Sequence, residues 1–257
     1  MNSIVDKDGL QISTMEDWRV RAKPKSDDHW VPERSAMESA RAWIDGAPNI
    51  PMEIAELIAS HPDFRSLTEW EAKPEARVKF DQFGGEPANV DVLVNGRDSH
   101  GPLVIAVEAK ADEPFSTILK DTLSSAQGRL EKTPKSKGVA RIERLLQGLF
   151  GSSTLDITRY KDLRYQLMTL TAAALAEAER KSADRAIVIV HEFVTSKTQD
   201  INHAANAKDL DAFISAIAPG NTLSNSGKLD GPFSVPGKPI VASDIALYFG
   251  KVVVNRR

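Results

Sequence analysis

Residues 103–112 read LVIAVEAKAD, an apolar strand that ends in a glutamate and a lysine two positions apart, Glu108 and Lys110. Side chains at positions i and i+2 of a strand point to the same face, so both charges share one side of a sheet. Charges near the interior of a sheet are costly unless they are paired or bound to a metal. A carboxylate and an ammonium group around a divalent cation suit phosphodiester hydrolysis, which needs an activated water and compensation of negative charge.

A second acid is expected on the preceding strand. Asp91 lies in NVDVLV, and the connection NGRDSHGP to the next strand is short, so we expect an antiparallel hairpin with its turn at Asn95-Gly96. Asp91 and Glu108 on neighbouring strands can then share one Mg²⁺, with Mn²⁺ as a substitute and the Ala109 carbonyl as a further ligand. Lys110 would orient the attacking water or stabilise the developing negative charge.

A structural explanation of the same residues stays open. In that case Glu108 and Lys110 form an ion pair at the edge of the sheet, and Asp91 is an ordinary solvated residue. A second alternative keeps the expected fold but has a catalytically inactive site. The protein is then a nucleic-acid-binding or protein-interaction module. An enzyme acting on another phosphate substrate is a third alternative.

The hydrophobic pattern predicts alternating blocks of helices and strands. In residues 35–46, Ser35 and Glu38 form a capping-box pattern. In residues 185–194, four consecutive β-branched residues predict a strand buried on both faces and added in parallel. Residues 1–34 are expected to be an arm or cover, and 35–257 a single domain. Helices are predicted at 35–46, about 51–60, 63–72, 115–131, 138–151, 160–181 and 206–220, the last capped by Asn206; strands are predicted at 75–80, 89–96, 101–112, 185–194 and after 233.

The predicted elements follow the order helix, three strands, helix, strand, with an acid on the second strand and Glu-x-Lys on the third. This arrangement resembles that of the PD-(D/E)xK or restriction-endonuclease-like superfamily. The resemblance covers about residues 50–195. Asp91 matches the first acid, and Glu108 and Lys110 in VEAK match the second acid and the lysine. Pro87 departs from the pattern, because it lies four residues before Asp91. The resemblance implies an α/β fold with a mixed central β-sheet flanked by helices, and a Mg²⁺-dependent nuclease with DNA as the expected substrate.

Other residues are expected near this site. The helix containing LRYQL resembles those that bring a glutamine or arginine to the site in some branches of the superfamily, here Gln166 as a catalytic residue and Arg164 as a substrate-binding one. Asp112 and Glu113 are expected to cap the helix that follows them. Between Arg129 and Arg144 there are six Lys or Arg against two Glu. This segment is expected either to contact substrate phosphates or to be a solvated loop; its candidate contacts are Lys135, Lys137 and Arg141.

Composition and missing motifs exclude several other classes. The 257 residues carry a net charge of −3 and contain no cysteine, which excludes disulfides and thiolate nucleophiles and fits a reducing cytoplasm. No apolar run is long enough to cross a membrane, and the first residues do not form a signal peptide. HEFVT has Thr195 where a zinc protease needs a second histidine, and the P-loop, G-x-S-x-G and G-x-G-x-x-G motifs do not occur. The expected partner is nucleic acid, with a homodimer or a partner protein also open.

Overall fold

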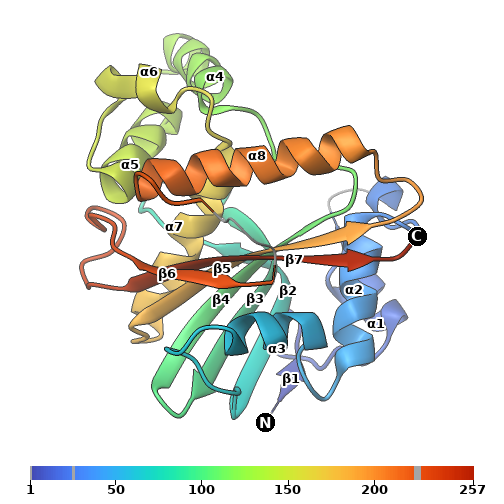
Figure 1. Cartoon of the computed structure of the whole chain (residues 1–257). Coiled ribbons are helices and arrows are strands. Elements are labelled where there is room, and N and C mark those ends of the chain that lie inside the picture. Colours follow the sequence, from blue (N-terminus) through green and yellow to red (C-terminus); the bar gives the residue numbers. More distant parts are fainter. Residues whose placement is uncertain (1, 25–26, 223–226) are drawn as a thin grey trace.

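The computed structural model describes residues 2–24, 27–222 and 227–257. These residues form a seven-stranded mixed sheet with helices against both faces (Figure 1). The strand order is β1-β2-β3-β4-β5-β7-β6. The predicted α/β class with a mixed central sheet flanked by helices is therefore confirmed. The strands are β1 Ser3–Ile4, β2 Glu69–Val78, β3 Ala88–Asp98, β4 Gly101–Lys110, β5 Arg185–Val194, β6 Leu229–Phe233 and β7 Ala246–Asn255.

Two hydrophobic cores lie on opposite faces of this sheet. Along β4, Val104 and Ala106 belong to the core under α4, α5, α7 and α8, while Ile105 and Val107 belong to the core under α1, α2 and α3. This alternation follows from the two-residue period of a strand. The helices are α1 Met15–Arg21, α2 Ser35–Gly46, α3 Met52–Ala59, α4 Leu119–Lys132, α5 Gly138–Phe150, α6 Ile157–Tyr160, α7 Tyr165–Arg180 and α8 Asp200–Ile217.

The strand pairing brings the predicted site residues to one end of the sheet. β2 and β3 are antiparallel, as are β3 and β4, whereas β4 and β5 are parallel. The prediction of a buried, parallel strand at 185–194 is confirmed. The carboxyl ends of β2 and β4 consequently lie beside the amino end of β3, where Asp91 is located.

The helix predicted over residues 63–72 is wrong. β2 begins at Glu69 and pairs with β1 on one side, through Ser3↔Glu71, and with β3 on the other. Trp70 and Ala72 are buried while Glu69 is exposed, so this stretch already has the alternation of a strand. Pairing with two neighbours outweighs the weak helical preference of a short charged segment.

The predicted turn at Asn95-Gly96 is also wrong, because both residues pair inside β3. The hairpin turns at Ser99 and His100. The Asp98 carboxylate accepts the His100 N–H at 2.8 Å, and Gly101 has φ +122°, a conformation that favours glycine. The hairpin between β3 and β4 itself is present as predicted.

Two predicted helix caps are not observed. Ser35 is the first residue of α2, and its hydroxyl donates to Glu113 at 3.1 Å instead of accepting from its own helix. α8 begins at Asp200, so Asn206 lies inside it. The buried Asn206 amide donates to the Glu113 carbonyl at 2.9 Å. Both side chains therefore bind the segment that follows β4.

Residues from the first 34 positions are built into the sheet and the core. β1 pairs in parallel with β2, and Ile4, Ile12 and Trp18 are buried together with residues of α2 and α3. The predicted cover is thus joined to the rest of the fold by a strand and by apolar contacts. None of the helices in the described ranges combines the length and the apolar character needed to span a membrane.

Candidate functional site

A cavity of about 310 Å³ opens at the end of the sheet where β4 finishes. Its floor is formed by β2, β3 and β4, which contribute Glu75, Asp91 and Glu108. One wall comes from the N-terminal segment and α2, including Ser39, and the other from the residues after β4 and from Gln166 of α7. The structure therefore brings the predicted acids, the lysine and the glutamine to a single cavity.

Glu108, Lys110 and Gln166 form a hydrogen-bonded triangle. The Lys110 ammonium lies 2.6 Å from Glu108 Oε1 and 3.3 Å from Gln166 Oε1. The Gln166 amide nitrogen donates to the same Glu108 oxygen at 2.6 Å. Glu108 and Lys110 are 1% and 5% exposed, so this charge pair lies in a medium of low dielectric, where electrostatic interactions are strong.

The second carboxylate oxygen of Glu108 is buried and has no hydrogen-bond partner within the described part of the chain. Burial raises the pKa of Glu108, and the nearby Asp91 carboxylate raises it further, against the opposing effect of Lys110. Burial alone would lower the pKa of Lys110, but the Glu108 and Asp91 carboxylates outweigh this and raise it. The cavity therefore has an excess of negative charge that a bound cation would compensate.

Asp91 is held next to Glu108 by the backbone of β4. The β3–β4 pairing ends at Val92↔Val107, and beyond it the Asp91 carboxylate accepts the Ala109 N–H at 2.8 Å. Over the described residues no group of three or more histidine, aspartate or glutamate side chains is placed to hold a metal ion. Mg²⁺ commonly takes one or two carboxylates and completes its octahedron with waters and substrate oxygens, so the pair of Asp91 and Glu108 fits this ion.

Gln166 is positioned by the start of α7. The predicted helix over 160–181 is interrupted, because α6 ends at Tyr160 and α7 starts at Tyr165. Ser116 fixes the first turn of α7: its hydroxyl accepts the Gln166 N–H, and its own N–H donates to Gln166 Oε1, both at 3.1 Å. The glutamine side chain consequently has a defined orientation toward Glu108 before any substrate binds.

Arg164 does not point toward the acids, so the prediction that it reaches them is wrong. Its guanidinium donates to Asp209 of α8 at 2.8 Å and to the Ser116 carbonyl at 3.2 Å. Arg164 is the residue just before α7, where the chain direction differs from that of the helix. Its ion pair fastens α8 to the loop that holds Gln166.

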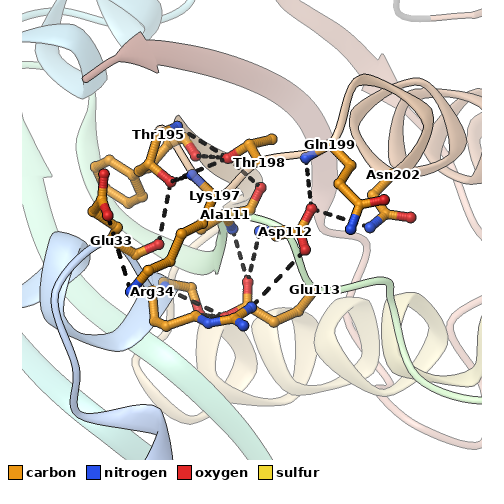
Figure 2. Close-up of polar contacts among 12 residues, drawn as sticks. Glu33, Arg34, Ala111, Asp112, Glu113, Thr195, Lys197, Thr198, Gln199 and Asn202 are labelled. Carbon is orange, nitrogen blue, oxygen red and sulfur yellow. Dashed lines mark hydrogen bonds and ion pairs between the residues drawn. The ribbon is translucent and has the colours of Figure 1, made fainter. Parts of the chain in front are cut away.

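Asp112 and Glu113 bind two distant helices and not the helix that follows them, which corrects the prediction (Figure 2). The Glu113 carboxylate accepts the N–H groups of Ala111 and of Ser35, the first residue of α2. Burial alone would raise the pKa of Glu113, but these N–H groups outweigh it and lower the pKa. Asp112 accepts the N–H of Gln199, the residue before α8, at 2.7 Å. The chain just after Lys110 is thus tied to both α2 and α8.

A family model of a domain of unknown function, DUF6946, matches residues 11–256. The chain belongs to this family. No curated protein and no solved structure is similar enough to match it. Because the match includes β2 to β5 together with α7, every residue of the cavity floor lies within the DUF6946 domain.

Two further residues of the DUF6946 domain face the cavity and were not found by sequence analysis. Glu75 has φ +49° within β2, and its carboxylate accepts from the Asn89 amide at 2.7 Å. Ser39 of α2 is buried, and no hydrogen-bond partner for its hydroxyl occurs among the residues described. Ser39 lies 52 positions before Asp91, and no local pattern connects the two.

The basic residues predicted to contact substrate lie outside this cavity. Arg141 of α5 donates to the Asp81 carboxylate at 2.7 Å and to the Glu86 carbonyl, so it braces the loop between β2 and β3. Lys135 and Lys137 are exposed in the loop between α4 and α5. Their side chains belong to a neighbouring cleft.

Proposed function

We propose that this protein is a metal-dependent nuclease that hydrolyses phosphodiester bonds, with DNA as the expected substrate. The observation that carries the proposal is the state of Glu108: one oxygen binds Lys110 and Gln166, while the other is buried without a partner beside Asp91. The order α3, β2, β3 and β4, then the helices α4 to α7, then β5, together with the antiparallel and parallel pairings, supports the resemblance to the restriction-endonuclease-like superfamily.

The residues fit a divalent cation. A buried carboxylate oxygen without a partner is costly, and Asp91 adds a second negative charge to the same cavity. Asp91 and Glu108 would hold Mg²⁺ or Mn²⁺, and the Ala109 carbonyl stays a predicted further ligand. Such an ion supplies a bound water of lowered pKa and neutralises charge on the scissile phosphate.

The side chains around the acids have separate roles in this proposal. Lys110 stabilises the negative charge that develops on the phosphate oxygens, since its ammonium group is almost completely shielded from water. Gln166 positions the reacting groups, because its amide contacts both Glu108 and Lys110 and is itself fixed by Ser116. The lack of cysteine is consistent with a cytoplasmic location, which we also propose.

Cleavage of plasmid and of single-stranded DNA in Mg²⁺, Mn²⁺ or EDTA tests this function. We expect the wild type to cut in Mg²⁺ or Mn²⁺ and not in EDTA, and Glu108→Gln to lose cleavage because the amide cannot supply the negative charge. Glu56→Gln is the matched control, since Glu56 is an exposed residue of α3 outside the cavity. A wild type that cuts neither DNA with any of these metals would contradict the proposal.

A non-catalytic nucleic-acid-binding or interaction module is the second candidate. The observation in its favour is the 2.6 Å contact between Lys110 and Glu108, which compensates both charges in the absence of a metal. In that case neither the wild type nor the Glu108→Gln variant would cut DNA, and the substitution would change only the stability of the folded protein.

A further inference from the structure

A second cleft, of about 700 Å³, lies between the loop that joins β2 to β3 and the loop that joins α4 to α5. Gly84 and Gly85 form part of one side, and a side chain at Gly85 would be strained because its φ is +131°. The other side carries four basic residues, of which Arg141 is paired with Asp81 and the other three are Arg129, Lys135 and Lys137.

The positive charge of this cleft is uncompensated. Arg129, Lys135 and Lys137 are exposed, and none of them is paired with a carboxylate in residues 2–24, 27–222 and 227–257. The acid that lines the cleft, Glu86, forms an ion pair with Arg77 outside the cleft lining. α5 starts beside the three cations without an acidic residue in its first turn.

Two short stretches of chain join the lining of this cleft to the lining of the candidate site. Tyr165 lines the cleft, and the next residue of α7, Gln166, lines the site. Glu86 lines the cleft, and Asn89, three residues further along, lines the site. Residues 86–89 and 165–166 therefore contribute to both the cleft and the candidate site.

We propose that this cleft binds the sugar–phosphate backbone of a single-stranded segment of nucleic acid next to the phosphate that is to be cleaved in the cavity of Asp91 and Glu108. The inference rests on the proposed function and specifies its substrate. Glu108 is 1% exposed at the base of a cavity of about 310 Å³. A flexible single strand can bend so that one phosphate enters this cavity while neighbouring phosphates contact the cleft, which a stiff base-paired duplex does less readily.

The salt dependence of binding tests the cleft separately from catalysis. A labelled single-stranded oligonucleotide is titrated with protein in EDTA at several salt concentrations. Each phosphate contact contributes about 0.7 to the slope of log K against log salt for single strands. We expect Lys135→Gln/Lys137→Gln to lower the steepness of the slope by about 1.4, and addition of Arg129→Gln to lower it by about 2.1.

Lys181→Gln/Lys228→Gln removes the same charge elsewhere and is the matched control. Lys181 follows the far end of α7, about 22 Å along the helix from Gln166, and Lys228 precedes β6, the edge strand on the side of the sheet away from β2 and β3. The control should keep the wild-type slope. A matching duplex should bind more weakly than the single strand.

Each result decides one of the two proposals. Any one of three outcomes would refute single-strand binding by the cleft. These are an unchanged salt slope in the Lys135/Lys137 variant, no salt-dependent binding by the wild type, and a duplex that binds as tightly as the single strand. If the wild type cuts DNA but the Lys135/Lys137 variant keeps the wild-type salt slope, the proposed role of the cleft is refuted and the proposed nuclease function stands. If the cleft binds the oligonucleotide but the wild type does not cut DNA in Mg²⁺ or Mn²⁺, the proposed role of the cleft stands and the proposed nuclease function is refuted.

Discussion

Lys110 separates the catalytic from the structural explanation at the scale of single residues. We expect Lys110→Ala to retain both carboxylates and to bind Mn²⁺, while cleavage falls by about a hundredfold to a thousandfold, the usual effect of removing one charge-stabilising donor. The loss of stability should be modest, because the raised pKa of Glu108 lets this buried carboxyl take up a proton. Single-turnover cleavage and thermal melting on the same protein measure both quantities.

Lys181→Ala serves as the control for this experiment, since Lys181 is exposed beyond the end of α7. If Glu108 stayed ionised after the loss of Lys110, the stranded buried charge would cost about 3–5 kcal/mol under either explanation, so cleavage is the measurement that separates the two. A variant that melts far earlier, from a wild type without cleavage in either metal, would refute the catalytic role.

Gln166 should act on the rate and not on substrate affinity. Gln166→Glu replaces the amide donor beside Glu108 with a second carboxylate, and Gln166→Ala removes both contacts. Outer-shell partners of this kind are typically worth about tenfold to a hundredfold in activity or metal affinity. We expect kcat to fall in this range with KM little changed, and Gln166→Glu to be the slower of the two. Equal kinetics for the wild type and both variants would refute a role of Gln166 in the reaction. Gln147→Ala, at an exposed position of α5, is the control.

The sequence predicted the site residues that depend on local spacing. Glu108 and Lys110 share a face because they are two positions apart on one strand. Ser39 and Glu75 could not be found in this way, because their places in the cavity depend on how α2 and β2 pack. Arg164 adjoins the helix that carries Gln166, yet it binds Asp209, 45 positions away, and no pattern around Arg164 identifies that partner.

At the scale of elements, a buried ion pair fastens the β3–β4 hairpin to the start of β5. Asp98 is 3% exposed and accepts two hydrogen bonds from Arg185, at 2.7 and 3.0 Å. Burial alone would raise the pKa of Asp98, but Arg185 and the N–H groups of Arg65 and His100 outweigh it and hold the pKa at about 2. The folded protein therefore keeps this carboxylate ionised at a lower pH than the unfolded chain does.

This shift predicts a loss of stability in acid. The contribution of Asp98 is fully present above its unfolded pKa near 3.8 and is lost as the pH falls through about 2. Asp98→Asn should cost about 3–5 kcal/mol at neutral pH, because Arg185 loses its partner. Urea unfolding from pH 6 to pH 2 should show this difference narrowing by about 2 kcal/mol. Asp121→Asn, at an exposed position of α4, should show no such narrowing, and a constant difference for Asp98→Asn would contradict the assignment.

Most predicted elements are present, and the start of β2 shows why one of them was given the wrong bounds. β2 was predicted six residues too short at its start because Trp70 and Ala72 alternate with charges only briefly before Pro74. Its length is set by pairing with β1, which lies more than sixty residues earlier in the chain. Local preference identified the periodic helices and β5, whereas the edges of β2 depend on distant partners.

For the molecule as a whole, metal binding should be visible as stabilisation. A ligand that binds only the folded state at a hundred times its Kd adds about 2.7 kcal/mol. For a chain of this size each kcal/mol is worth about 2–4 °C in Tm. We expect Mn²⁺ to raise the Tm of the wild type by several degrees, EDTA to reverse the change, and Asp91→Asn/Glu108→Gln to show no shift. An equal shift in the variant would indicate that Mn²⁺ binds elsewhere.

The contacts that close the cavity join parts of the chain that are synthesised far apart. Ser35 and Glu113 are separated by 78 positions, Asp112 and Gln199 by 87, and Glu108 and Gln166 by 58. Closing such long loops is slow, and chains of this length commonly pass through intermediates. After dilution from urea, far-ultraviolet circular dichroism should recover before Mn²⁺-dependent stabilisation and cleavage do. Simultaneous recovery would mean that the site assembles with the helices; a lag would mean that a refolding chain stays inactive until its most distant segments have met.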